Sequence, residues 1–388
     1  MAEDAAQPAP STGMPNPESP RAMAAGRWAF MDLLNVVAMF AVILLHVSLN
    51  IFDMQADTAW NVALVYQCVA IFAVPIFFMV SGANLLGYRE RYDTRTFFRK
   101  RALRVVVTLV VWSAVVYVLL CVAGPLFGYA PRRFGLIEFA KELLTCGVIS
   151  IYWFFYVIIG LYLVTPIFSL VAANRRVLEY TLVLAIALCF IVPAIDAFGP
   201  VHLVTDPFAL RFFTWSLTYY LLGFYLTRYW NRRIPAVALV AVCVVCVACM
   251  LGATWALNHA GVAANAASAA NAAAGYNNLF AAAECIFALP YAASLFLLGK
   301  QGEGRIAQAK SYPVWKRLSA LSLTVYAVHL LFVWIFDAHV LTLVAPNTTG
   351  ALLLQFVAEP LVVYAVSLAV AWVVEAVKRA IKERRANG

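Results

Sequence analysis

The stretch FMDLLNVVAMFAVILLHVSLNIF, residues 30–52, decides the fold class of this protein. A helix needs about 20 apolar residues to cross a bilayer, and this stretch is long enough. Its apolar side chains lie on every face of such a helix, whereas a membrane β-strand alternates polar and apolar residues. The stretch therefore predicts a transmembrane α-helix.

The composition of the whole chain agrees with this prediction. Hydrophobic residues make up 64% of the 388 residues and charged residues 12%, against roughly 25% charged residues in a typical soluble domain. The mean hydropathy is +0.84. These values exclude a soluble enzyme, a nucleic-acid-binding protein and a small secreted domain held by disulfides, and they make membrane lipids the surroundings of the protein.

Further apolar runs follow the first one along the chain. They lie near residues 60–86, 102–122, 151–172, 177–198, 211–230, 234–257, 278–299, 318–341 and 350–375. Together with residues 30–52 they predict an all-α polytopic membrane protein with about ten transmembrane helices. An even number of spans places both termini on the same side.

The distribution of basic residues predicts which side that is. The net charge is +9, and 24 of the 28 Lys and Arg residues fall on the side of the termini if there are ten spans. Cytoplasmic loops carry an excess of Lys and Arg. Both termini are therefore expected to be cytoplasmic, and the basic balance marks topology rather than nucleic-acid binding.

The chain divides into a membrane domain and two tails. Residues 1–26 contain five prolines and no apolar run, which predicts a disordered cytoplasmic tail. Residues 27–378 hold the predicted spans and form one ten-helix membrane domain. Residues 379–388 form a short basic cytoplasmic tail.

The first span carries Asp32, Asn35 and His46. Asn35 and His46 are eleven residues apart, close to three helical turns, so they share one face at a separation of roughly 16 Å. Polar residues inside a membrane are costly and often functional, and histidine exchanges protons near neutral pH. His46 is thus a candidate catalytic residue. The alternative is a histidine that is only hydrogen-bonded to a neighbouring helix.

A basic loop precedes the third span and contains Arg101 and Arg104. At a spacing of i and i+3 the two side chains are neighbours on a helix. Paired guanidinium groups suit phosphate recognition. The alternative is ordinary anchoring of a cytoplasmic loop, which needs only positive charge.

Further ionisable residues lie in the last two spans. We expect His329 to be a packed, hydrogen-bonded residue, and Glu359 to line an outer cavity with Asp337 and His339. Three cysteines, Cys243, Cys246 and Cys249, have a spacing that resembles a metal site, but they lie in an apolar helix. We interpret them as small packing residues, and no metal site is predicted.

Several segments of the chain follow one another in a characteristic order. They are MDLLNVVAMFAVILLHVSL in span one, VPIFFMVSGANLL (Val74–Leu86), RxxR at Arg101–Arg104 followed by VVWSAVVY, YWFFYVIIGLYLVTPIF (Tyr152–Phe168), YLLGFYL (Tyr220–Leu226) and LTVYAVHLLF (Leu323–Phe332). In this order the chain resembles the acyltransferase 3 family of integral-membrane O-acyltransferases, from about Arg27 to the end of span ten.

The resemblance implies an enzyme of the bacterial plasma membrane. Such an enzyme moves an acyl group, usually acetyl, from cytoplasmic acyl-CoA to a hydroxyl of an envelope glycan or lipid-linked saccharide. Acetyl-CoA is then a substrate, and no permanently bound cofactor is expected. His46 occupies the family's catalytic position, as general base or as acyl carrier, and Arg101 and Arg104 match its donor-binding pair.

One position departs from the family pattern. Asn35 stands eleven residues before the histidine, where the family has an arginine, so the resemblance leaves open how span one holds the donor. We expect Asn35 to contribute to donor binding, with Asp32, His329 and Glu359 as candidate supporting polar groups. A transporter or glycan flippase is the alternative function, but it would usually show inverted repeats, and none is evident.

Overall fold

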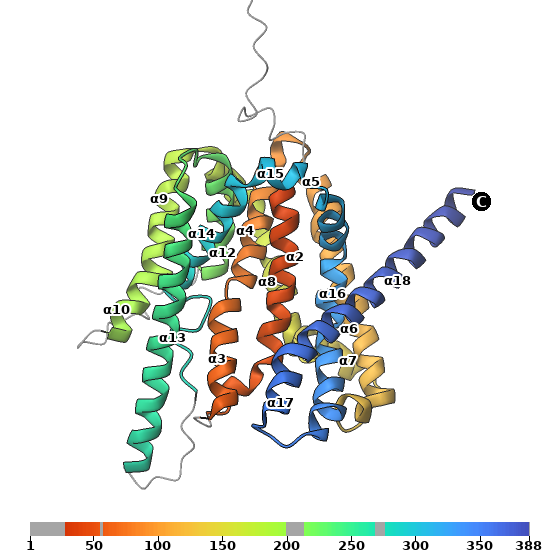
Figure 1. Ribbon diagram of the computed structural model, residues 1–388. Helices are drawn as coiled ribbons and strands as arrows, with labels where there is room; N and C mark the ends of the chain where they lie inside the picture. Colours follow the sequence, from red (N-terminus) through yellow and green to blue (C-terminus); the bar gives the residue numbers. More distant parts are fainter. Residues whose placement is uncertain (1–27, 55–56, 199–212, 268–275, 388) are drawn as a thin grey trace, which may run out of the picture.

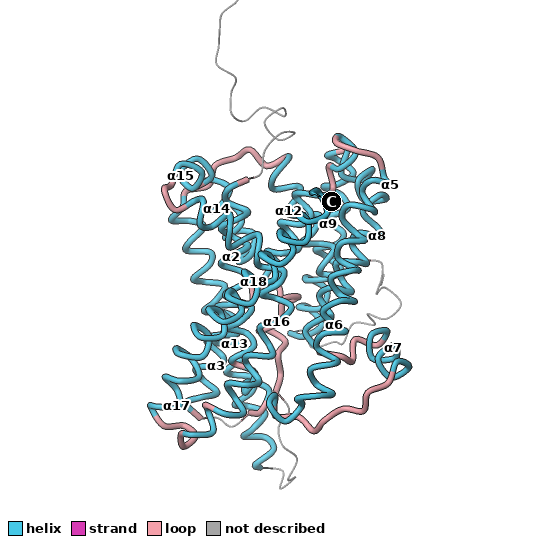
Figure 2. Tube along the Cα trace, turned by 90° about the vertical axis from the view of Figure 1, so that its right-hand side faces the viewer, coloured by secondary structure: helices cyan, strands magenta, loops and turns pink. Residues whose placement is uncertain are grey.

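The computed structural model describes residues 28–54, 57–198, 213–267 and 276–387, and all regular elements among them are helices (Figure 1). The longer helices are α2 (Ala29–Val47), α3 (Thr58–Ala70), α4 (Ala73–Leu85), α6 (Leu103–Ala123), α8 (Trp153–Ala173), α9 (Arg175–Ile186), α12 (Trp215–Arg228), α13 (Ala236–Ala267), α14 (Ala288–Gln301), α16 (Tyr312–His339) and α18 (Glu359–Asn387). Figure 2 shows helices and loops, with no strand in the described part of the chain.

Short helical segments connect these helices. They are α5 (Thr94–Phe97), α7 (Leu136–Leu144), α10 (Val192–Phe198), α15 (Glu303–Gln308) and α17 (Thr349–Leu353), the 3-10 segments η1 (Leu49–Phe52), η2 (Tyr88–Glu90), η4 (Gly124–Phe127), η5 (Ser150–Tyr152) and η7 (Leu341–Leu343), and the π segments η3 (Phe98–Ala102), η6 (Ala187–Ile191) and η8 (Leu354–Ala358). In Figure 1, α5 and α15 lie at one end of the bundle, and α7 and α17 lie at the other.

The prediction of an all-α polytopic membrane protein is confirmed. Eight stretches of the described chain are long and apolar enough to span a membrane, namely Ala29–Val47, Thr58–Glu90, Thr94–Phe127, Ser150–Ala173, Arg175–Asp196, Ala236–Gly261, Tyr312–Leu343 and Thr349–Arg384. The protein is therefore a multi-pass membrane protein.

Two of the expected spans contain shorter helices. Near 211–230 and 278–299 the structure has α12 and α14, of 14 residues each. A helix of this length measures about 21 Å, less than the roughly 30 Å of a bilayer's hydrocarbon core. Residues 276–278 have no regular structure, and turns and bends occupy residues 279–287 before α14 begins. The number of ten spans and the cytoplasmic position of the termini therefore stay predictions.

Of the two expected tails, the structure describes only the C-terminal one. The predicted disordered tail, residues 1–26, lies outside the described residues. The predicted basic tail from residue 379 is a continuation of α18, which ends at Asn387. In Figure 1 this end of α18 projects away from the bundle.

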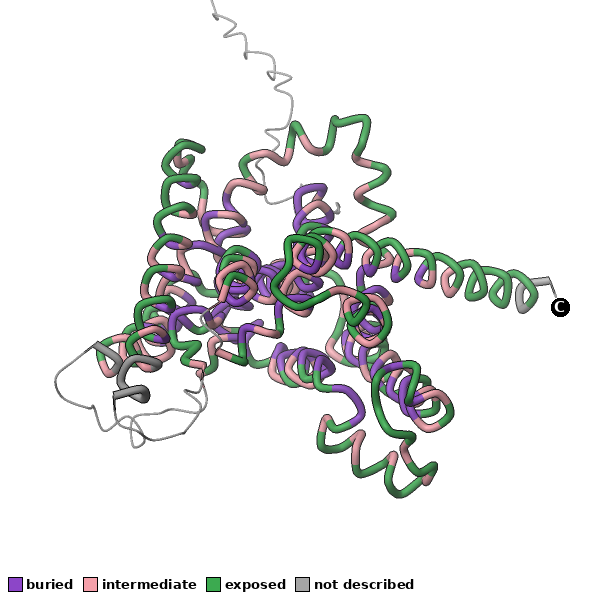
Figure 3. Tube along the Cα trace, turned by 60° about the horizontal axis from the view of Figure 1, so that its bottom comes forward, coloured by how far each residue is buried: buried purple, intermediate pink, exposed green. Residues whose placement is uncertain are grey.

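Burial separates inner helices from outer ones (Figure 3). Most residues of α12 are buried, including Tyr219 and Tyr220 at 0% exposure. By contrast, α6 and α13 carry exposed valines, as expected of helices that face lipid. The core of the molecule is thus formed by the helices that surround α2, α4 and α12.

The predicted run near 60–86 is two helices rather than one. The helix α3 ends at Ala70 and α4 begins at Ala73. Pro75 lies in the first turn of α4, where proline is tolerated, but it cannot continue a helix that arrives from before it. This break lets α4 approach α12.

Two glycines permit the close crossing of α4 and α12. A Cβ atom added at Gly82 would lie 1.7 Å from the Tyr220 carbonyl oxygen, and one at Gly223 would lie 2.0 Å from the Met79 carbonyl oxygen. Small residues at helix interfaces in membranes allow such backbone approach. The crossing fixes the position of the segment Ser81–Asn84, which lines the cavity described below.

The N-terminal end of α2 is held by a distant carboxylate. The backbone N–H groups of Ala29 and Phe30 donate to Glu303 of α15, at 3.0 and 2.8 Å. The first N–H groups of a helix have no partner within the helix, and a negative charge there is favourable. Glu303 therefore attaches the start of α2 to α15.

Candidate active site

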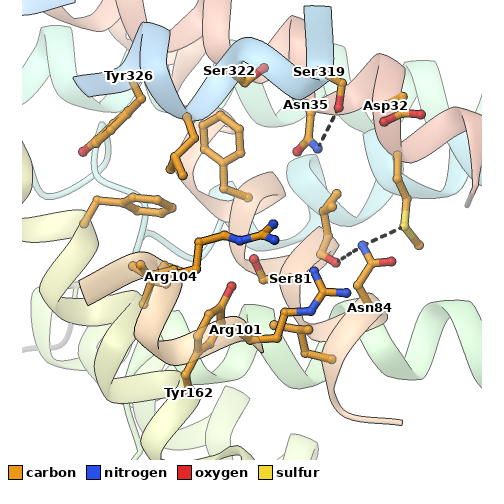
Figure 4. Close-up of a pocket in the computed structure, with 18 of the residues that line it drawn as sticks. Asp32, Asn35, Ser81, Asn84, Arg101, Arg104, Tyr162, Ser319, Ser322 and Tyr326 are labelled. Atoms are coloured by element: carbon orange, nitrogen blue, oxygen red, sulfur yellow. Dashed lines mark hydrogen bonds between the residues drawn. The ribbon is translucent and has the colours of Figure 1, made fainter. Parts of the chain in front are cut away.

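A cavity of about 610 Å³ lies among α2, α4, α6, α8 and α16 (Figure 4). It is near the end of the bundle where α2 begins, because its lining from α2 consists of Trp28, Met31, Asp32 and Asn35. The other polar lining residues are Ser81, Asn84, Arg91, Arg101, Arg104, Tyr162, Ser319, Ser322 and Tyr326. Four of the residues singled out in the sequence, Asp32, Asn35, Arg101 and Arg104, thus line one space.

The two arginines lie three residues apart in one continuous helical stretch. Arg101 belongs to the π segment η3, and Arg104 follows in the first turn of α6. A π segment is frequent at functional sites because it changes the direction in which side chains leave a helix. In Figure 4 both side chains extend into the cavity, opposite Asn35 and Ser319.

Neither guanidinium group is neutralised by a residue in the described part of the chain. Among the described residues, Arg101 and Arg104 have no hydrogen bond or ion pair from their guanidinium groups. The carboxylate of Asp32, at the far side of the cavity in Figure 4, accepts a hydrogen bond from the Tyr312 hydroxyl at 3.2 Å. The cavity therefore offers two cationic forks to a ligand that carries negative charge.

Asn35 faces α16 as well as the cavity. Its amide donates to the Ser319 hydroxyl at 3.3 Å, and Asp32, one turn earlier, also meets α16 through Tyr312. Both residues therefore connect α2 to α16.

The faces of α2 and α16 that line the cavity each lead to a histidine. On α2 the face of Asn35 reaches His46 after eleven residues, and on α16 the face of Ser322 and Tyr326 reaches His329. Neither histidine lines the cavity itself, whose wall ends at Tyr326. The Tyr326 ring centroid lies 5.7 Å from that of His329, so the histidines lie directly behind this ring.

His46 and His329 contact each other. His329 Nε2 lies 3.4 Å from His46 Nδ1, and the ring centroids are 4.9 Å apart in an edge-to-face arrangement. His329 is fully buried, whereas His46 is only partly buried. The expectation that His329 is a packed, hydrogen-bonded residue agrees with this geometry.

Backbone carbonyl groups determine which nitrogen of each ring carries the proton. Val42 O lies 2.7 Å from His46 Nδ1, and Tyr326 O lies 2.8 Å from His329 Nδ1. A carbonyl oxygen only accepts, so the network assigns the proton of each neutral ring to Nδ1. His329 Nε2 is then an acceptor that faces the Nδ1–H of His46, and His46 Nε2 is the nitrogen with a lone pair.

Comparison with known families agrees with this geometry. A family model described as an acyltransferase domain, acyltransferase 3, matches residues 28–376. The chain belongs to the acyltransferase 3 family. No curated protein and no solved structure matches it. The match begins at Trp28 and includes every residue of the cavity and both histidines, so this membrane protein is an acyltransferase.

Tyr326 separates the cavity of the acyltransferase from its histidine pair. Its hydroxyl donates to the carbonyl oxygen of Ile151, and its ring packs against Phe154 and Phe155 with centroids 5.2 and 5.5 Å away. The ring is therefore held from both sides. A ligand in the cavity that reaches His46 must pass beside it.

Glu359 does not face the outer cavity expected for it. The side chain is fully buried, and among the described residues its carboxylate oxygens have no hydrogen-bond partner. Asp337 and His339 are exposed instead, and His339 Nε2 meets the Leu126 carbonyl oxygen at 2.9 Å. Because α18 starts at Glu359 and packs along α16 and α2, the carboxyl is enclosed between helices.

The three cysteines of α13 form no cluster with other ligands. Within the part of the chain that the structure describes, no group of three or more His, Cys, Asp or Glu side chains is close enough to hold a metal ion. Cys246 is buried, and Cys243 and Cys249 are partly buried on one helix.

Besides two tyrosines, Tyr162 and Tyr326, five polar residues of the cavity were missed in the sequence. They are Ser81, Asn84, Arg91, Ser319 and Ser322. A signal for two of them was present in the segment VPIFFMVSGANLL, where Ser81 and Asn84 interrupt an apolar run. The others come from a loop and from α16, and their approach depends on how the helices pack.

Proposed function

We propose that this acyltransferase transfers an acetyl group from cytoplasmic acetyl-CoA to a hydroxyl of an envelope glycan or lipid-linked saccharide, in the bacterial plasma membrane. The observation that carries the proposal is the pair of unneutralised guanidinium groups of Arg101 and Arg104 in a cavity whose helices lead to His46. No cofactor is needed for this reaction, because the thioester itself supplies the driving force.

The cavity suits the donor in charge and in position. Guanidinium forks bind phosphate through two parallel hydrogen bonds, and acyl-CoA carries its phosphates at the end opposite the thioester. The arginines lie near the start of α2, at the end of the bundle that the distribution of basic residues assigns to the cytoplasm. The pantetheine arm would then extend along α2 past Tyr326.

His46 supplies the base for the chemical step. Its Nε2 takes the proton of the acceptor hydroxyl, while the hydroxyl oxygen attacks the thioester carbonyl carbon. The carbon–sulfur bond breaks, and the leaving thiolate takes the proton from Nε2, so that the products are the ester and free CoA. During this exchange the Nδ1–H of His46 stays bonded to Val42 O, and His329 Nε2 faces the imidazolium.

A direct test measures release of free CoA by the purified full-length protein in lipid nanodiscs supplied with acetyl-CoA and with an envelope-glycan extract as the source of acceptor hydroxyls. We expect steady CoA release by the wild type and a loss of at least 100-fold in His46→Ala. His259→Ala is the matched control, because His259 also lies on a membrane helix but stacks on Trp255 at 4.1 Å. Absence of CoA release by the wild type would favour a flippase, and more than a tenth of the activity in His46→Ala would exclude His46 as the base.

A further inference from the structure

The end of α2 beyond His46 is held by amide side chains from two other elements. Gln67 of α3 donates to the Leu45 carbonyl oxygen at 2.8 Å and to the Ser48 hydroxyl at 2.9 Å. Gln355 of η8 donates to the Val47 carbonyl oxygen at 3.0 Å. The last carbonyl groups of a helix lack partners within it, so these bonds fix where α2 ends.

Gln355 also bonds to Asn50, which lies four residues after His46. The Nε2 atom of Gln355 donates to Asn50 Oδ1 at 3.2 Å. Gln355 belongs to the π segment η8, which Tyr66 ties to α3 through a hydrogen bond from its hydroxyl to the Phe356 carbonyl oxygen. A π segment thus presents a polar residue here, as η3 presents Arg101 at the donor cavity.

Each amide keeps one group that the described part of the protein does not use. Among the described residues, the Asn50 NH₂ group and the Gln355 Oε1 atom have no hydrogen-bond partner. Both side chains are partly exposed, and neither atom is among the buried unpartnered ones. One donor and one acceptor are therefore available side by side, about one turn beyond His46.

The chemistry of this pair suits neutral hydroxyl groups. A hydroxyl both donates and accepts a hydrogen bond, so two neighbouring hydroxyls of a sugar ring can use both amides at once. The charged residues that follow Asn50 in the chain, Asp53 and Asp57, are acidic, which disfavours a phosphate or carboxylate at this place.

We propose that Asn50 and Gln355 form the acceptor subsite, which binds hydroxyls of a saccharide ring and presents a neighbouring hydroxyl to His46 Nε2. The inference rests on the proposed function, because it takes His46 as the base. It assigns the donor and the acceptor to opposite ends of α2, with Asn35 at one end and Asn50 at the other.

The test separates transfer to saccharide from transfer to water. Inside-out membrane vesicles of the source cells, which contain the native glycans and the full chain, receive acetyl-CoA labelled with ¹⁴C in the acetyl group. Alkali-labile label in the saccharide fraction and free acetate are measured for the wild type, Asn50→Ala and Gln355→Ala. Asn61→Ala is the matched control, because Asn61 is an amide at the start of α3 that donates to the Asp57 carbonyl oxygen.

We expect each of the two variants to lower the ratio of ester to acetate about tenfold, as expected for the loss of one well-placed hydrogen bond to substrate. The KM for acetyl-CoA should stay unchanged in both variants. The Asn61→Ala control should form as much ester and as much acetate as the wild type. Asn50→Ala leaves the bond from Gln355 to Val47 in place, so it tests the subsite without releasing the end of α2.

Two results would overturn the inference. An unchanged ratio would show that the amides do not contact the acceptor, and an equal fall of ester and acetate would show that they only hold α2. Failure of the proposed function is distinct, because it would appear as absence of both products in the wild type or as their persistence in His46→Ala.

Discussion

His46 Nδ1 lies 3.4 Å from His329 Nε2, although 283 residues separate the two in sequence. Since the Tyr326 carbonyl oxygen takes the Nδ1–H of His329, the nitrogen that faces His46 can only accept. In the proposed reaction, a hydrogen-bond acceptor beside Nδ1 stabilises the imidazolium that forms when Nε2 takes a proton. We therefore predict that His329 is a positioning residue for His46.

Replacement of His329 by Leu should lower kcat about 10- to 100-fold, the usual effect of losing a hydrogen bond to a charged group. His329→Gln should recover part of the loss, because its carbonyl oxygen can accept from His46. The KM for acetyl-CoA should not change in either variant. Steady-state kinetics in nanodiscs gives both constants, and equal losses in the Gln and Leu variants would contradict the role.

Replacement of Arg101 or Arg104 should weaken donor binding. Lysine keeps the charge but loses the fork, so Arg→Lys should raise the KM for acetyl-CoA several-fold, and Arg→Ala should raise it about 10- to 100-fold. Arg99→Ala is the control, because Arg99 lies in the same π segment but does not line the cavity. An equal rise of KM in the control, or loss of membrane insertion with an unchanged KM, would favour simple anchoring.

Asn35→Ala should be milder than His46→Ala. The Asn35 amide lines the cavity and donates to Ser319 at 3.3 Å, and it offers a donor only a neutral hydrogen bond. We expect a rise of about three- to tenfold in the KM for acetyl-CoA and a nearly unchanged kcat. Collapse of kcat at constant KM would place Asn35 in the chemical step instead.

Alanine at Gly82 or Gly223 should destabilise the bundle. The added Cβ would lie 1.7 or 2.0 Å from a backbone carbonyl oxygen of the facing helix, so the helices must move apart at a cost of about 1–3 kcal/mol or more. Gly160→Ala is the control within α8, because its added Cβ would meet no atom of the other described helices within 4 Å. Thermal unfolding in detergent should show a lower Tm for the first two variants and no loss for the control.

The helical period was sufficient to predict parts of the site that lie on one helix. It placed Asn35 and His46 on one face of span one, and it placed Arg101 beside Arg104. It was not sufficient to pair His46 with His329, because that contact depends on how α2 packs against α16. The same limit explains why Ser319 and Arg91 were missed.

The lengths of the helices were predicted less well than their positions in the chain. Hydropathy gave helices at nearly the expected places, but apolar residues before α14 form turns rather than helix, and Pro75 divides the run near 60–86 in two. An apolar run indicates that a segment is buried in lipid or in protein. It does not record how much of the segment is helical when neighbouring protein can satisfy its backbone groups.

Both ends of α2 are attached to other parts of the bundle, by Glu303 at the start and by Gln67 and Gln355 at the finish. A carrier that exposes its site first to one side and then to the other would have to break one of these sets of bonds in every cycle. In the proposed enzyme α2 stays in place, and only the pantetheine arm with its acyl group extends the roughly 16 Å from Asn35 to His46. The permeability barrier to CoA and to the glycan can then remain closed throughout turnover.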